Sequence, residues 1–200
     1  MFDYMVKPKV IAHRINSKSQ LLKLDRRLGA EVDIRSDYQK LYIQHDPFTS
    51  GEAFSDWLDC YDHGTLILNV KEEGLEEFIL EKLKEREITD FFFLDQSYPF
   101  LLRNSIRLDK KSAVRLSEYE SIETVELMRN SASWVWVDYF STAILDTKLS
   151  ERLKCLGLNI CLVSPELQGF NENKVEQYQR YLVANRIAFD AVCTKHYNKW

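Results

Sequence analysis

Two histidines and two carboxylates lie within the first quarter of the chain, close to short apolar runs. His13 follows the apolar residues of KVIA, and His45 follows LYIQ. Glu31 and Asp33 alternate with apolar residues in EVDIR. Imidazoles exchange protons near neutral pH, and carboxylates bind hard cations. This combination of residue types is suited to metal-assisted phosphoryl chemistry.

The pattern around these residues predicts three β-strands, because β-branched and apolar residues run between turn-forming stretches. The predicted strands are Lys9–Arg14, Glu31–Arg35 and Leu41–Asp46. Alternate side chains of a strand share a face, so Glu31 and Asp33 should lie about 6–7 Å apart and reach one Mg²⁺ or Ca²⁺ ion. An ion pair with Arg35 or Lys71 is the structural alternative.

The composition is that of an ordinary globular domain, with 200 residues, 45% hydrophobic and 29% charged residues. A net charge of −4 gives no basis for nonspecific nucleic-acid binding. The four cysteines lack CxxC spacing, and those inside apolar runs, Cys161 and Cys193, are predicted to be buried free thiols. Neither a cleavable leader nor an apolar run of membrane-spanning length is evident, so we expect a cytoplasmic protein.

Strand-like and helix-like segments then alternate along the chain with short connections, and no linker divides them. They include a predicted helix over Ser19–Arg27 and predicted strands over Phe91–Leu94 and Trp134–Val137. Helix Leu75–Arg86 illustrates the pattern, because Leu75, Phe78, Ile79 and Leu83 recur at three- and four-residue steps. Eight such units predict an α/β fold, a single compact (β/α)₈ TIM barrel over residues 1–200. The last strand ends close to Trp200, so we expect the eighth helix to be missing. An open doubly wound sheet is the alternative.

Four short motifs stand in order at the expected strand ends. They are His13-Arg14, Glu31-Val32-Asp33, His45-Asp46 and Asn69-Val70-Lys71. Over about Val10–Lys71 this pattern resembles the glycerophosphodiester phosphodiesterase family, within the phosphatidylinositol-phospholipase-C-like barrel phosphodiesterases. The resemblance implies that one histidine activates the nucleophile and the other protonates the leaving group, in an order that the sequence leaves open.

The resemblance also implies a bound divalent cation, and here the chain departs from the family pattern. Asn69 stands where the family usually has a third carboxylate ligand, so the metal set would be Glu31, Asp33 and Asn69 and metal binding should be weaker. Ile15 stands where a glycine usually follows the first motif. From its length we also do not expect the chain to have the longer loops that often cover the family's substrate.

Charged residues at strand ends are candidates for contact with the substrate. Arg14 and Lys71 are predicted to bind the phosphate, with Arg115 as a further candidate. Asp138, Glu166 and Lys195 follow later strands and are possible additional pocket residues, with solvent exposure as the alternative. Asp138 or Glu166 would then supply the negative charge that Asn69 lacks.

The leading functional hypothesis is metal-assisted hydrolysis of a small soluble phosphodiester, such as a glycerophosphodiester or a sugar phosphodiester. Neither a nucleic acid nor a membrane is expected as a partner, and the oligomeric state is left open. One alternative is a weak or inactive relative that binds a phosphorylated metabolite, for which Asn69 is the argument. Another is unrelated chemistry at the same end of a barrel, because a fold does not fix a function.

Overall fold

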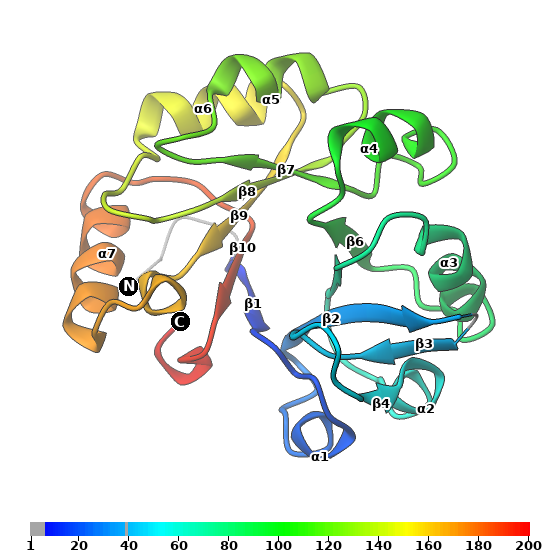
Figure 1. Ribbon diagram of the computed structural model, residues 1–200. Coiled ribbons are helices and arrows are strands. Elements are labelled where there is room, and N and C mark those ends of the chain that lie inside the picture. The colour runs from blue at the N-terminus through cyan, green and yellow to red at the C-terminus, as the bar shows by residue number, and fades with distance from the viewer. Residues whose placement is uncertain (1–6, 39) are drawn as a thin grey trace.

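The computed structural model describes residues 7–38 and 40–200, and in this part of the chain eight parallel strands curl around one axis (Figure 1). These strands are β1 (Lys9–Ala12), β2 (Gly29–Asp37), β5 (Leu66–Val70), β6 (Phe91–Leu94), β7 (Ala113–Leu116), β8 (Trp134–Val137), β9 (Asn159–Val163) and β10 (Ala191–Thr194). The first strand pairs with both β2 and β10, so the sheet curls back on itself. The fold is therefore the predicted barrel and not an open doubly wound sheet.

Helices form the outer ring around these strands (Figure 1). They are α1 (Lys18–Leu21), α2 (Phe54–Leu58), α3 (Glu76–Lys84), α4 (Tyr98–Asn104), α5 (Ile122–Met128), α6 (Thr147–Cys155) and α7 (Glu172–Ala184), with the 3₁₀ turns η1 (Pro165–Gln168) and η2 (Tyr197–Lys199). Within the described residues only η2 follows β10, as expected for a barrel without its last helix.

A short antiparallel arm extends the sheet beside β2. It consists of β3 (Lys40–Ile43) and β4 (Glu52–Ala53), and β3 pairs with the carboxyl half of β2. The backbone N–H of Gln44 donates to the carbonyl of Asp33 over 3.0 Å. His45 therefore arrives at the same end of the barrel as the two carboxylates, although it lies outside the ring of parallel strands.

Alternation along the strands separates an inner core from an outer one. In β2, Ala30, Val32 and Ile34 pack outward beneath the helices, whereas Glu31 and Asp33 point to the barrel interior. The inner core is apolar elsewhere, and the rings of Phe92 and Trp134 stack with their centroids 4.5 Å apart. The inner core also buries the free thiols of Cys161 and Cys193, which confirms the prediction for both.

The barrel has a seam between β6 and β7. A single backbone bridge, between Phe93 and Ser112, joins the two strands. Side chains reinforce this bridge: the Ser112 hydroxyl donates to Gln96 Oε1 over 2.6 Å, and the Arg115 guanidinium donates to Asp95 Oδ1 over 2.5 Å. The weakest backbone pairing in the ring is thus held largely by polar side chains.

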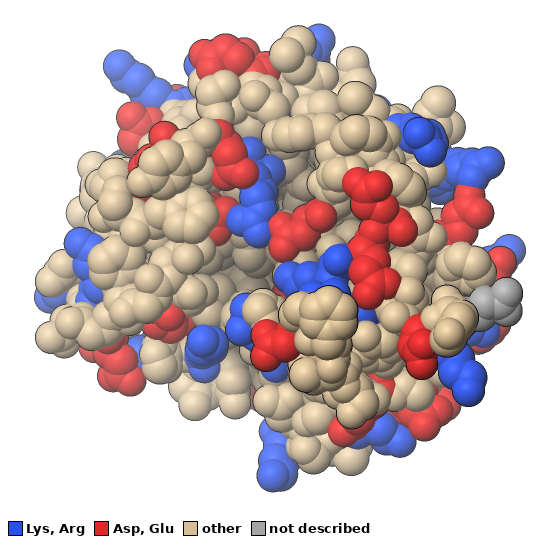
Figure 2. Space-filling model, viewed as in Figure 1, with Lys and Arg blue, Asp and Glu red and all other residues tan. Residues whose placement is uncertain are grey.

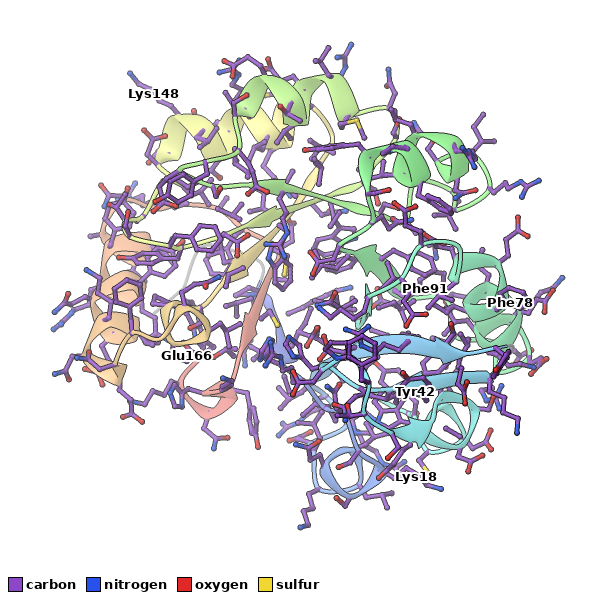
Figure 3. All side chains as sticks on the ribbon, viewed as in Figure 1. Lys18, Tyr42, Phe78, Phe91, Lys148 and Glu166 are labelled. Atoms are coloured by element: carbon purple, nitrogen blue, oxygen red, sulfur yellow. The ribbon has the colours of Figure 1, made fainter. Side chains whose placement is uncertain are left out.

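Two local predictions were wrong. The helix expected over Ser19–Arg27 is the single turn α1, since Asp25 accepts a hydrogen bond from the backbone N–H of Arg27, which competes with helical pairing. Phe78, predicted to be core, is 51% exposed on the outer side of α3 (Figure 3). In a nine-residue helix a narrow apolar stripe suffices, and Ile79 and Leu83 provide it.

Candidate active site

The carboxyl ends of the strands surround a polar cavity of about 280 Å³. Figure 2 shows basic and acidic side chains gathered around the centre of this face. The predicted site residues that line the cavity are His13, Arg14, Glu31, His45, Asn69, Lys71, Arg115, Asp138 and Lys195. Residues separated by more than 180 positions of sequence therefore meet at one mouth of the barrel.

The first motif lies where the chain leaves the barrel. β1 ends at Ala12, and the His13 N–H donates to the Thr194 carbonyl over 2.9 Å. Arg14 has a φ of 53°, a left-handed conformation that is costly for a side chain of this size. The turn breaks the strand's alternation, so Arg14 projects into the same cavity as His13.

Glu31 is buried at the floor of the cavity. Its Oε2 accepts from the backbone N–H of Arg14 over 2.7 Å, and its Oε1 accepts from the Asn69 amide over 2.9 Å. The Nε2 of His13 lies 3.8 Å from Oε2. Burial, and then the charge of Asp33, raise the pKa of Glu31 to about 7. A positive charge near Glu31 would therefore stabilise its ionised form.

Asp33 lies deeper than Glu31 and is fully buried. Its Oδ2 accepts from the Asn16 amide over 2.7 Å, and the Lys71 ammonium lies 3.1 Å from its Oδ1. The Arg14 Nε is 3.7 Å from Oδ2. The ion pair with Lys71 is the structural alternative raised above, whereas Arg35 instead pairs with Glu72.

Three buried polar atoms at the site have no hydrogen-bond partner among the described residues. They are Nδ1 of His13, Oδ1 of Asn69 and Oδ1 of Asp33, and only the last of these lies in an ion pair, 3.1 Å from the Lys71 ammonium. Leaving such an atom unpaired costs about 1–3 kcal/mol, so the orphaned atoms of His13 and Asn69 beside a buried carboxylate mark a place that a ligand would complete.

Glu31, Asp33 and Asn69 point to the same face of two paired strands, with Asp33 and Asn69 directly opposite each other. Oxygen donors of this kind suit Mg²⁺ or Ca²⁺. No group of three His, Cys, Asp or Glu side chains in residues 7–38 and 40–200 could hold a metal ion. A cation here would therefore need the amide oxygen of Asn69 as its third ligand.

The two histidines have different surroundings. Burial, and then the positive charges of Arg14 and Lys195, lower the pKa of His13 to about 4, so this ring is neutral at pH 7. His45 is more exposed; its Nδ1 lies 2.8 Å from the Asp46 carboxylate and its Nε2 lies 2.6 Å from Arg14 Nη2. Because the guanidinium can only donate, Nε2 of His45 accepts and Nδ1 carries the proton.

Arg115 bridges two carboxylates across the mouth. It donates to Asp95 over 2.9 and 2.5 Å and also to Asp138, whose other oxygen accepts from Gln168 over 3.2 Å. Burial raises the pKa of Asp138 to about 6 against the opposing effect of Arg115. The single positive charge of Arg115 offsets these two carboxylates only in part, whereas Lys195 lines the cavity with its side chain exposed.

Glu166 lies on η1 (Figure 3) and does not line the cavity. Its carboxylate accepts from Ser164, from the Thr194 hydroxyl over 2.5 Å and from the Lys195 N–H over 2.9 Å. Burial acts to raise its pKa, but these hydrogen bonds outweigh burial and lower it. Glu166 therefore fixes the loop that carries Lys195 and does not replace the charge missing at Asn69.

Sequence reasoning missed three residues of the site. Asp95 follows β6 with a φ of 65° and lies between Arg115 and the Lys71 ammonium, 3.5 Å from the latter. Gln168 lines the cavity from η1, and Asn16 holds Asp33. The position of Asp95 directly after a strand is a signal that could have identified it.

Solved structures that share this fold include glycerophosphodiester phosphodiesterases. A candidate enzyme of that name from Galdieria sulphuraria superposes with a TM-score of 0.74 at 14% identity, covering 98% of this chain and 96% of its own. One from Agrobacterium tumefaciens gives 0.69 at 13% identity, covering 96% and 97%. An Oleispira antarctica phosphodiesterase in complex with the product sn-glycerol-3-phosphate gives 0.68 at 17% identity, covering 96% and 94%.

The comparisons by sequence add nothing to this, since no family model and no curated protein matches the chain. The likeness to solved structures confirms the resemblance at the level of the fold: this chain has the barrel of the glycerophosphodiester phosphodiesterases over nearly its whole length. No helix among the described residues is long and apolar enough to cross a membrane.

Proposed function

We propose that this protein is a phosphoric diester hydrolase that acts on a small soluble phosphodiester, with His13 and His45 as its acid–base pair. The observation that carries the proposal is the meeting of both imidazoles in one cavity with the cationic side chains of Arg14, Lys71 and Lys195. Such cations can bind the anionic phosphate. One imidazole can accept a proton from the nucleophile, and the other can donate a proton to the leaving group on the opposite side of the phosphorus.

The surroundings of the histidines suggest their roles. His13 is neutral and its ring is confined beside Glu31, so it is the better candidate to accept a proton from the attacking nucleophile. His45 is more exposed and is oriented by Asp46, so it would protonate the leaving alkoxide. This second role requires Arg14 to release Nε2 of His45, which a bound phosphate would favour by attracting the guanidinium.

We further propose that Glu31, Asp33 and Asn69 hold a divalent cation, Mg²⁺ or Ca²⁺. The orphaned Oδ1 of Asn69 supports this, because a half-turn of the amide would aim that oxygen at the side of Glu31. When bound, the cation would neutralise phosphate oxygens and make a coordinated water more acidic. Since Asn69 brings no charge, binding should be weak.

A second candidate function is binding of a phosphorylated metabolite without turnover. Two features favour this function. Asn69 stands where the family usually has a third carboxylate, and the Arg14 guanidinium donates a hydrogen bond to Nε2 of His45. A cytoplasmic location remains a prediction under either function.

Turnover of bis(p-nitrophenyl) phosphate and of a glycerophosphodiester, with Mg²⁺, Mn²⁺, Ca²⁺ or EDTA, tests the proposal. We expect hydrolysis that is stimulated by at least one cation and lost in His13→Ala. Hydrolysis unaffected by EDTA would contradict the proposed metal site and leave the proposed histidine mechanism standing. If no diester is hydrolysed while sn-glycerol-3-phosphate still raises the melting temperature, the binding function is correct.

A further inference from the structure

A second hollow lies beside the central cavity, at the seam between β6 and β7. It has a volume of about 360 Å³ and is lined by the loop after β6, the start of α4, and β7. Asp95 and Arg115 line both this seam groove and the central cavity. The groove therefore adjoins the place where the phosphate of a substrate would lie.

The walls of the seam groove are amphiphilic. Leu101, Ala113 and Val114 contribute apolar surface, and Glu120 contributes a carboxylate at the edge. Ser97 adds a hydroxyl that is buried and has no hydrogen-bond partner among the described residues. An unpaired hydroxyl in a hollow of this size is the kind of polar group that fixes the orientation of a bound ligand.

Tyr98 completes the groove with an aromatic ring that is 45% exposed. Carbohydrates and cyclitols have an apolar ring face and a rim of hydroxyl groups. The ring face can pack against an aromatic or aliphatic wall, and the hydroxyl groups can form hydrogen bonds with hydroxyl and carboxylate groups beside that wall. A carboxylate accepts hydrogen bonds from alcohols, and Ser97 can both donate and accept. The groove therefore has the chemistry to recognise a polyhydroxylated ring.

We infer that the seam groove binds the alcohol portion of the substrate, and that this alcohol is a sugar or a cyclic polyol. The inference rests on the proposed function, because it places the phosphate of the same molecule in the central cavity. An acyl chain would desolvate Asp95 and Glu120 without compensation. A quaternary ammonium group is best held by several aromatic rings, and Tyr98 is the one aromatic residue that lines the described groove.

Two substrates that differ only in the alcohol test this inference. Glycerophosphoinositol carries a cyclic polyol and glycerophosphocholine carries a cation, on the same glycerophosphate. We expect kcat/KM to be at least tenfold higher for the inositol ester. Ser97→Ala and Glu120→Gln should each raise KM for that ester about five- to tenfold, the loss expected for one hydrogen bond, and leave hydrolysis of bis(p-nitrophenyl) phosphate unchanged.

Ser121→Ala is the matched control. Like Ser97, Ser121 precedes a helix and makes no capping hydrogen bond to its backbone, but it does not line the groove. This variant should have wild-type KM for both esters. Equilibrium titration of each ester against the variants gives a readout that does not depend on turnover, and the same five- to tenfold loss should appear in Kd.

The possible results separate the two proposals. If the aryl diester is hydrolysed but Ser97→Ala and Glu120→Gln leave both KM and Kd for the inositol ester unchanged, the seam groove is not a substrate site and the proposed function stands. Preference for the choline ester, weakened by Glu120→Gln, would overturn the sugar assignment. If no diester is hydrolysed but Kd for the inositol ester still rises in the variants, the proposed function fails and the groove assignment holds.

Discussion

Two polar clusters meet at the mouth of the barrel, and they differ in how fully their groups are paired. In the cluster from β1, β2 and β5, His13 and Asn69 each leave a buried polar atom without a hydrogen-bond partner in the described structure. In the cluster around Arg115, the guanidinium joins Asp95 to Asp138, and Gln168 adds a further hydrogen bond. The first cluster is arranged for a ligand, whereas the second is complete by itself.

The largest effect expected from this difference is on catalysis. His13→Ala and His45→Ala should each lower kcat by about 10² or more and leave the melting temperature nearly unchanged, because neither ring belongs to the apolar core. Under the proposed mechanism both histidines act on one transition state, so the double variant should be scarcely slower than the slower single one. Steady-state kinetics and thermal melts provide the measurement.

The pH dependence of kcat/KM adds a check on the same pair. Two groups with divided roles should give a bell-shaped profile whose limbs belong to the pair and not to one residue. A profile that stays bell-shaped with both limbs unmoved in His45→Ala would exclude His45 as an acid or base.

Breaking the paired cluster should affect stability next most strongly. Arg115→Met leaves Asp95 and Asp138 without their shared cation, so the free energy of unfolding at pH 8 should fall by about 2–3 kcal/mol. The loss should shrink as the pH falls towards about 6 and stay constant below it, because removal of Arg115 raises the pKa of Asp138 in the variant above its wild-type value of about 6. Urea denaturation across pH measures this.

Lys195→Met is the control for Arg115→Met. It also removes a cation from this cavity, but the Lys195 side chain is exposed. It should change stability by less than about 0.5 kcal/mol. Equal destabilisation in both variants would show that total charge matters at this mouth and that the individual pairings do not.

An effect of similar size and opposite sign is expected at Glu31. The folded state raises the pKa of Glu31 from 4.5 to about 7, so wild-type stability is lost as the pH rises through about 7. Glu31→Gln avoids this loss, and at pH 8 without metal it should stabilise the protein by up to about 3 kcal/mol. The gain should disappear below pH 4.5, as measured by urea denaturation in EDTA.

The same variant should lose any cation-induced rise in melting temperature, because the buried charge that attracts the ion is gone. Destabilisation by Glu31→Gln at pH 8 in EDTA would contradict the assignment of Glu31 to the incomplete cluster.

The smallest effect is predicted at Phe78, which belongs to neither cluster. Its ring is half exposed on α3, so Phe78→Ser should change the free energy of unfolding by no more than about 0.5 kcal/mol. Ile79→Ser, one position along the same helix, removes a fully buried side chain and serves as the contrasting variant.

The order of strands and helices could be predicted from the sequence because each buried strand is a short apolar run between turns. Phe91–Leu94 and Trp134–Val137 were placed without error, whereas the helix after β1 was drawn too long. Hydrophobic periodicity reports burial, but it does not report local hydrogen bonds such as that between Asp25 and Arg27.

For the site, most of the candidate residues lie around one cavity because the carboxyl ends of parallel strands share one edge of a barrel, whereas Glu166 does not line that cavity. The pairing among them could not be predicted. That Arg115 binds Asp95, and that Glu166 supports Lys195, depends on contacts between distant loops. The left-handed backbone at Arg14, whose side chain lines the cavity, likewise carries no sequence signature.

The seam between β6 and β7 has a consequence for how the barrel opens. Elsewhere in the ring, neighbouring strands are joined by ladders of backbone pairs. Between β6 and β7 a single bridge, from Phe93 to Ser112, joins the arc of strands that ends at β6 to the arc that begins at β7. Local unfolding follows such weak boundaries, so amide hydrogen exchange should be fastest along this line. A molecule bound across the seam would hold the two arcs together. When the groove is occupied, amide hydrogen exchange should therefore become slower in both arcs.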